Sequence, residues 1–173
     1  LAYVGGAGLS VVDLSDEASW PIIGWCLVGA GIEGIAVQGG YAYVATVPSR
    51  LMVFDVTNPA APHIVGLVVG PDNALDVVVV GHHAFVACRE AGVRVVDVAD
   101  PAHPVIVAGV DTPGLACKLL AAEGILYCAD FGAGLQVIDI GDPLAPVIVG
   151  AAAIPGAAND LVRYGDFIVV AGY

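Results

Sequence analysis

An internal repeat of 42 residues runs through this chain and limits the folds that are open to it. Four aspartates mark the repeat, and each closes a run of apolar residues just before a turn: Asp13, Asp55, Asp97 and Asp139. The aromatic residues Tyr43, Phe85 and Tyr127 keep the same spacing. A repeat of this length indicates one small structural unit per copy, which buries its apolar faces by stacking on its neighbours.

Each unit contains four short runs of Val, Ile and aromatic residues, separated by turn residues. In the third unit the runs cover 76–80, 84–88, 93–98 and 104–110. The density of Gly and Pro leaves no apolar period of 3.6 residues, so no helix is expected. Four β-strands in about forty residues, repeated along a chain, are typical of propeller blades. We therefore predict an all-β fold, a β-propeller built of four-stranded blades of 42 residues.

Some of the runs are apolar at consecutive positions, as in DVVVV (76–80) and PVIVG (146–150). Strands of this kind are expected to be buried on both faces. Blades that stack radially meet this demand better than a sandwich with one wet face. The two tryptophans, Trp20 and Trp25, belong to an outer run and are expected to pack against the next blade.

The repeat also predicts the blade boundaries. Three complete blades are expected at 34–75, 76–117 and 118–159, with an incomplete blade at 1–33 and the start of a further blade at 160–173. We expect a partial propeller that belongs to a ring of about seven or eight blades, completed either by a longer chain or by another copy. The end blades lack the polar outer face that an uncovered repeat needs, so self-association through them is a further expectation.

Composition excludes several classes of protein. Hydrophobic residues make up 58% of the 173 residues, but the longest uncharged runs are broken by Pro and Gly and are too short for a membrane span. A net charge of −12 argues against nucleic acid and against an anionic membrane surface as partners. The cysteines show no metal-like spacing and are expected to be buried free thiols, with the redox compartment left open: Cys26, Cys88, Cys117 and Cys128.

The motifs LSVVD, LMVFD, VRVVD and LQVID, with YAYVA and HAFVA before them, resemble the LVIVD repeat. The first copy departs from the pattern, because its turn reads LSDEASWP without an Asp-Pro or Asn-Pro pair. The resemblance implies a β-propeller and a location outside the cell or on the surface of a bacterium or archaeon. It brings no catalytic signature.

Charged residues gather at one face of the predicted blades, near the central channel, and this is where we expect the function of a repeat scaffold to lie. In an antiparallel blade the start of the innermost strand and the end of the second strand share one face, near the central channel. Six residues fall at this place and form the predicted rim, which would bind a small polar ligand or a partner protein: Glu33, Asp76, Arg89, Lys118, Asp130 and Asp160. In this interpretation Lys118 lies between carboxylates of neighbouring blades. The alternative is a solvated rim of weak ion pairs.

The sequence offers little for catalysis. The repeated aspartates are interpreted as caps of turns rather than as a carboxylate ring. There is no GxSxG motif, and the histidines do not converge, so neither a metal nor a cofactor is expected. We favour a non-enzymatic binding or structural scaffold outside the cell. The alternatives are a hydrolase at the channel mouth, using Asp76, Lys118, Asp130 and Asp160, and a self-assembling structural subunit.

Overall fold

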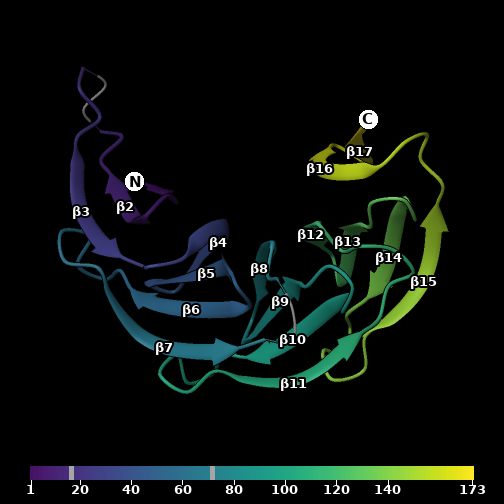
Figure 1. The fold of residues 1–173 in the computed structure, drawn as a ribbon, viewed down its shortest axis with the longest axis horizontal. Coiled ribbons are helices and arrows are strands. Elements are labelled where there is room, and N and C mark those ends of the chain that lie inside the picture. The colour runs from purple at the N-terminus through teal and green to yellow at the C-terminus, as the bar shows by residue number, and fades with distance from the viewer. Residues whose placement is uncertain (16–17, 71–72) are drawn as a thin grey trace.

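The structure is a computed structural model that describes residues 1–15, 18–70 and 73–173. In this part of the chain the ordered elements are strands, and they form five successive antiparallel sheets. Figure 1 shows the sheets following one another along an arc; in the three four-stranded sheets the first strand lies toward the centre and the last strand at the outside. The all-β propeller architecture predicted from the repeat is confirmed.

We number the sheets blade 1 to blade 5 in chain order. Blade 1 has three strands: β1 (Ala2–Val4), β2 (Gly8–Val12) and β3 (Ile22–Leu27). Blade 2 has four: β4 (Gly31–Gln38), β5 (Tyr41–Val47), β6 (Arg50–Asp55) and β7 (His63–Val69). Blade 3 has β8 (Asp76–Val80), β9 (His83–Ala87), β10 (Val93–Asp97) and β11 (Val105–Val110). Blade 4 has β12 (Lys118–Ala122), β13 (Ile125–Ala129), β14 (Leu135–Asp139) and β15 (Val147–Ala152). Blade 5 has β16 (Ala158–Tyr164) and β17 (Phe167–Gly172).

Within each complete blade the strands pair in the order of the chain, so that neighbouring strands are joined by short connections. The register shifts between the last two strands of blades 1 to 4, at the same repeat position: Val11/Val12, Val53/Phe54, Val95/Val96 and Val137/Ile138. A β-bulge of this kind bends a strand and increases its twist. The repeat thus fixes a bend of the outer strand as well as the number of strands.

The hydrophobic core lies between successive blades. Tyr43 and Val53 of blade 2 pack with Val77 and Val86 of blade 3. The same arrangement joins blade 3 to blade 4, where Phe85 is fully buried together with Leu126. Blades 1 and 2 and blades 4 and 5 share smaller clusters. Each blade is therefore stabilised mainly by its neighbours, as expected of a repeat protein.

The expectation that consecutive apolar runs are buried on both faces is wrong for the outer strands. In β11 and β15 alternate side chains are exposed, including Val105 at 54% and Val149 at 58%. The physical reason is that the blades diverge toward the outside of the arc (Figure 1), so neighbouring blades no longer cover both faces. Trp20 and Trp25 are likewise exposed, at 61% and 56%, so most of the surface of each side chain is not covered by the next blade as expected.

Within the described residues there is no helix of the length and apolarity needed to cross a membrane.

Candidate rim site at the inner strands

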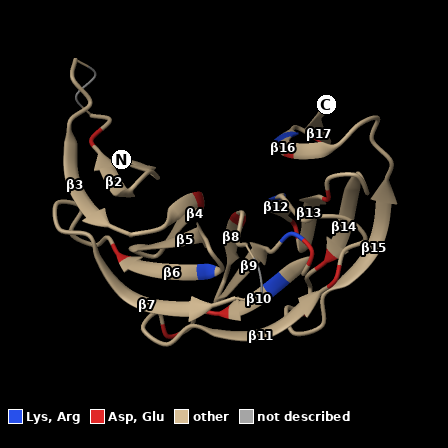
Figure 2. Cartoon of the chain, viewed as in Figure 1, with Lys and Arg blue, Asp and Glu red and all other residues tan. Residues whose placement is uncertain are grey.

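The six rim residues predicted from the sequence lie at the starts of the inner strands and in the turns that follow the second strands. The register places Asp76 of β8 beside Ala87 at the end of β9, and Lys118 of β12 beside Ala129 at the end of β13. Figure 2 shows charged segments at the inner strands β4, β8 and β12, and others at the ends of β6, β10 and β14 farther out. The positions are therefore those expected from an antiparallel blade, while the contacts of the side chains differ from one residue to the next.

Asp76 and Lys118 form a contact between blades 3 and 4. Lys118 Nζ donates to Asp76 Oδ1 at 3.2 Å, and the backbone amide of Leu119 donates to Asp76 Oδ2 at 2.9 Å. On its other side Asp76 lies against Gly34 of blade 2, where an added Cβ would lie 2.8 Å from Asp76 Oδ1. Asp76 is only 4% exposed. It thus connects three successive blades.

Burial raises the pKa of the Asp76 carboxyl group, because a charged form loses solvation there. The Leu119 amide and the Lys118 ammonium group oppose this shift without cancelling it. The carboxylate therefore uses both oxygens in contacts within the protein and has little surface left for a ligand.

Asp130 is buried in a second polar contact, next to the connection between β11 of blade 3 and β12 of blade 4. It accepts a hydrogen bond from Thr112 Oγ1 at 2.6 Å and another from the Gly114 amide at 2.8 Å. Burial raises the pKa of Asp130, and these two hydrogen bonds oppose the shift. The contact ties the turn after β13 to the segment that leads from blade 3 into blade 4.

The sequence interpretation did not include Thr112 or Gly114 in the rim. The available signal was the stretch Thr112-Pro113-Gly114, a turn-like segment just before an inner strand. A buried carboxylate must find donors, and a segment with a hydroxyl group and free amides at the entry of the same blade can supply them.

Arg89 lies in the turn after β9, where its backbone has a positive φ of 47°. Its amide donates to the carbonyl of Ala116, and the Ala116 amide donates back to the carbonyl of Arg89, both at 3.1 Å. Phe131 and Ala158 repeat this two-bond bridge 42 residues later, at 3.1 and 3.0 Å. Backbone groups make the bridge between blades, so it needs no particular side chain. The Arg89 guanidinium group lies 3.9 Å from the carboxylate of Glu90.

Glu33 and Asp160 are exposed. The Asp160 carboxylate accepts a hydrogen bond from the adjacent amide of Leu161 at 2.9 Å. The structure thus brings Lys118 to Asp76, whereas the carboxylate of Asp160 has a local partner on its own strand. Lys118 was expected to lie between two carboxylates. It contacts the carboxylate of Asp76, whereas the carboxylate of Asp160 bonds to the backbone of its own strand.

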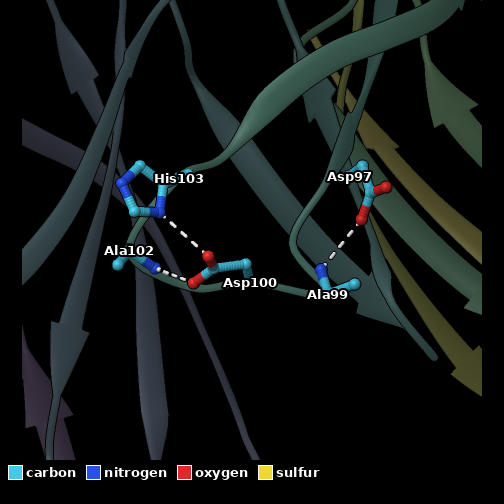
Figure 3. Close-up of polar contacts among 5 residues, drawn as sticks. All are labelled: Asp97, Ala99, Asp100, Ala102 and His103. Atoms are coloured by element: carbon cyan, nitrogen blue, oxygen red, sulfur yellow. Dashed lines mark hydrogen bonds and ion pairs between the residues drawn. The ribbon is translucent and has the colours of Figure 1, made fainter.

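The repeated aspartates lie at the opposite ends of the blades and cap turns, as predicted. Asp13, Asp55, Asp97 and Asp139 each accept a hydrogen bond from the amide two residues further on. A second turn follows in three blades, capped by Asn58, Asp100 or Asp142. Figure 3 shows both caps in blade 3, with His103 beside Asp100 at 2.8 Å.

The hydrogen bonds in these caps lower the pKa of three of the carboxyl groups. The hydroxyl and amide groups of Ser15 lower the pKa of Asp13, those of Thr57 lower the pKa of Asp55, and His103 with the amide of Ala102 lowers the pKa of Asp100. These carboxylates stabilise local turns and do not converge on a common site.

No group of three or more His, Cys, Asp or Glu side chains in residues 1–15, 18–70 and 73–173 is arranged to hold a metal ion. The four cysteines are free thiols, of which Cys88 and Cys128 are buried. Burial raises the pKa of the Cys117 and Cys128 thiols, so both are protonated at neutral pH. Neither is activated as a nucleophile.

Successive antiparallel sheets arranged about a common centre, three of them with four strands, define a repeat protein of the β-propeller type. The chain belongs to the LVIVD repeat family, whose pattern matches residues 1–28, 32–69, 71–112 and 113–153. No curated protein sequence matches the chain.

Two solved structures share the fold at very low sequence identity. One is the computationally designed Ika4 protein, with a TM-score of 0.69 and 9% identity over 84% of this chain and 87% of that protein. The other is the computationally designed Ika8 protein, with a TM-score of 0.68 and 10% identity over 83% of this chain. The aligned part spans 43% of the length of the Ika8 chain. At these identities the likeness extends to the fold alone.

Proposed function

We propose that this repeat scaffold is a non-enzymatic binding or structural module that works outside the cell or on its surface. One observation carries the proposal: the two buried carboxylates of the rim are used to hold blades together. Asp76 is occupied by Lys118 and the Leu119 amide, and Asp130 by Thr112 and the Gly114 amide. A hydrolase at this rim would need a carboxyl group within reach of the substrate or of a catalytic water.

The exposed part of the rim supports the binding role. Glu33 and Asp160 present carboxylates to solvent at the starts of β4 and β16. With a net charge of −12, the chain favours partners that bring basic or hydrogen-bonding groups. We assign the rim to a partner protein or a small polar ligand of this kind. The extracellular location is supported by the resemblance to LVIVD repeats.

The binding role is tested by co-sedimentation with a cell-envelope preparation from the source organism. The Glu33→Lys variant reverses one exposed rim charge and is expected to reduce the bound fraction several-fold. Asp166→Lys is the matched control, because it makes the same charge change in the turn between β16 and β17, at the other end of the inner strands. Equal binding by the wild type and both variants would contradict a rim site.

The location and the lack of catalysis need separate measurements. Protease treatment of intact cells is expected to remove the protein, whereas protection until lysis would place it inside. The purified chain is expected to leave chromogenic esters, glycosides and phosphate esters unhydrolysed. Turnover of any of them that disappears in the Asp76→Asn variant would establish the hydrolase instead.

A further inference from the structure

A groove opens between blades 2 and 3, at the ends of these blades that lie opposite the rim. It is formed by the end of β4 and the start of β5 on one side, and by the turn between β8 and β9 and the segment after β10 on the other. Its volume is about 320 Å³, within the range of about 300–1,000 Å³ for sites that bind small molecules. Six of its lining residues matter here: Gln38, Tyr41, Tyr43, His82, Val98 and Pro101.

Tyr43 brings an unpaired hydroxyl group to this groove. Its side chain belongs to the core between blades 2 and 3 and is only 4% exposed. The hydroxyl group nevertheless stays accessible, and it forms no hydrogen bond with any of the described residues. Burial and the neighbouring Tyr41 raise the pKa of Tyr43, so the group keeps its proton and can donate. Polar groups that are almost buried normally have a partner, and a ligand in the groove would supply one.

The repeat shows that the packing of the blades does not need this hydroxyl group. The residue at the same position of blade 3 is Phe85, which is 0% exposed and packs in the next core cluster. A phenyl ring therefore fills this place as well as a phenol ring does. The hydroxyl group of Tyr43 is a feature of the groove rather than a requirement of the fold.

Gln38 and His82 add polar atoms to the lining. Gln38 Nε2 donates to the carbonyl of Gly81 at 2.7 Å, a hydrogen bond that runs from blade 2 to blade 3. This bond orients the side-chain amide and leaves Oε1 without a partner among the residues that the structure describes. His82 is exposed in the turn after β8 and offers an imidazole ring. Val98 and Pro101 provide apolar surface. The lining therefore combines separate hydrogen-bonding atoms with an apolar wall.

The described lining of this groove contains no Asp, Glu, Lys or Arg, although the chain has a net charge of −12. A groove of about 250 Å³ occupies the same place between blades 4 and 5, and Tyr127 lines it as Tyr43 lines the first. There the ion pair of Arg163 with Glu123, at 2.7 Å, makes the lining charged. An ion in the groove between blades 2 and 3 would lose solvation without meeting a countercharge, so a neutral ligand fits this groove better.

We propose that the groove between blades 2 and 3 binds a neutral saccharide unit. A pyranose ring carries hydroxyl groups that both donate and accept, which suit the Tyr43 hydroxyl group, Gln38 Oε1 and the His82 ring. Its C–H faces pack on apolar and aromatic side chains, and it has no charge. This site is separate from the rim at the other end of the inner strands, and it does not depend on the role of the rim.

Titration of residues 1–173 with simple sugars, followed by ligand-observed NMR, tests the proposal. The neutral probes are the methyl glycosides of glucose, galactose, mannose and N-acetylglucosamine, and the charged probes are glucuronate and glucosamine. We expect at least one neutral glycoside to bind, and both charged probes to bind several-fold more weakly. Tyr43→Phe should weaken that binding by about 2- to 10-fold, which corresponds to the loss of one hydrogen bond. Tyr127→Phe is the matched control in the charged groove and should leave the Kd unchanged.

Two further measurements separate this site from folding and from the rim. The melting temperature of Tyr43→Phe should not fall, because Phe85 already fills the equivalent place, so weaker binding by this variant reports on the hydroxyl group. Glu33→Lys, at the rim, should bind the glycosides as the wild type does. Failure of all four neutral glycosides to bind would overturn the proposal. Equal effects of Tyr43→Phe and Tyr127→Phe, or tighter binding of a charged probe, would overturn it as well.

Discussion

Asp76 is the side chain through which blades 2, 3 and 4 meet, and it carries the first prediction at the scale of single residues. Replacing Asp76 by Ala leaves the Leu119 amide without its acceptor in a buried place. An unsatisfied buried donor costs about 1–3 kcal/mol, so the free energy of unfolding should fall by about that amount. Urea titration measures it. Asp160→Ala, at the equivalent and exposed position of blade 5, should change stability by less than about 0.5 kcal/mol; equal effects would contradict the role of Asp76.

The raised pKa of Asp76 predicts a pH dependence with a definite sign. The carboxyl group holds its proton more tightly in the folded chain than in the unfolded one, whose value is 3.8. The folded state therefore loses stability from this group as the pH rises from 3.8 through the higher folded value. The destabilisation caused by Asp76→Ala should accordingly be larger at pH 3.5 than at pH 7. Urea unfolding at the two pH values checks this, and the opposite order would show that the Lys118 ion pair outweighs burial.

At the scale of strands and turns, the close packing of an outer strand against the turn of the next blade predicts that an added methyl group there lowers stability. Gly66 lies in β7, and an added Cβ would overlap the backbone carbonyl of Pro101 in the turn of blade 3. Overpacking of this kind costs about 1–3 kcal/mol. Gly66→Ala should lower the free energy of unfolding by that amount. Gly132→Ala is the matched control, because an added Cβ there meets open space, and it should be neutral or stabilising by up to about 1 kcal/mol.

The same scale shows what the sequence could and could not predict. The 42-residue spacing of Asp55 and Asp97 predicted the blades and their caps, because a turn must recur once in every repeat. It could not predict the exposure of Val149, since the apolar run is the same whether one neighbour or two cover the strand. Nor could it predict that Thr112 reaches Asp130, because that hydrogen bond joins segments 18 residues apart through the path of a connection.

At the scale of the whole molecule, the excess of negative charge affects the stability of the fold. The chain carries 17 acidic and 5 basic residues, and its isoelectric point is about 4.2. Compact folding concentrates like charges and destabilises the folded state through repulsion. Salt screens this repulsion, because the Debye length falls from about 30 Å at 0.01 M to about 8 Å at 0.15 M ionic strength.

We therefore expect the melting temperature at pH 7.5 to rise between 0.01 and 0.15 M NaCl, and the rise to vanish at pH 4.2, where the net charge is close to zero. Scanning calorimetry at the two pH values measures both. The competing effect is the screening of ion pairs between blades, such as Lys118 with Asp76 and Arg163 with Glu123. Arg163 and Glu123 are largely exposed, and exposed pairs contribute about 0–1 kcal/mol each. Repulsion among the excess carboxylates should prevail, and a melting temperature that falls with salt at pH 7.5 would show that the ion pairs dominate instead.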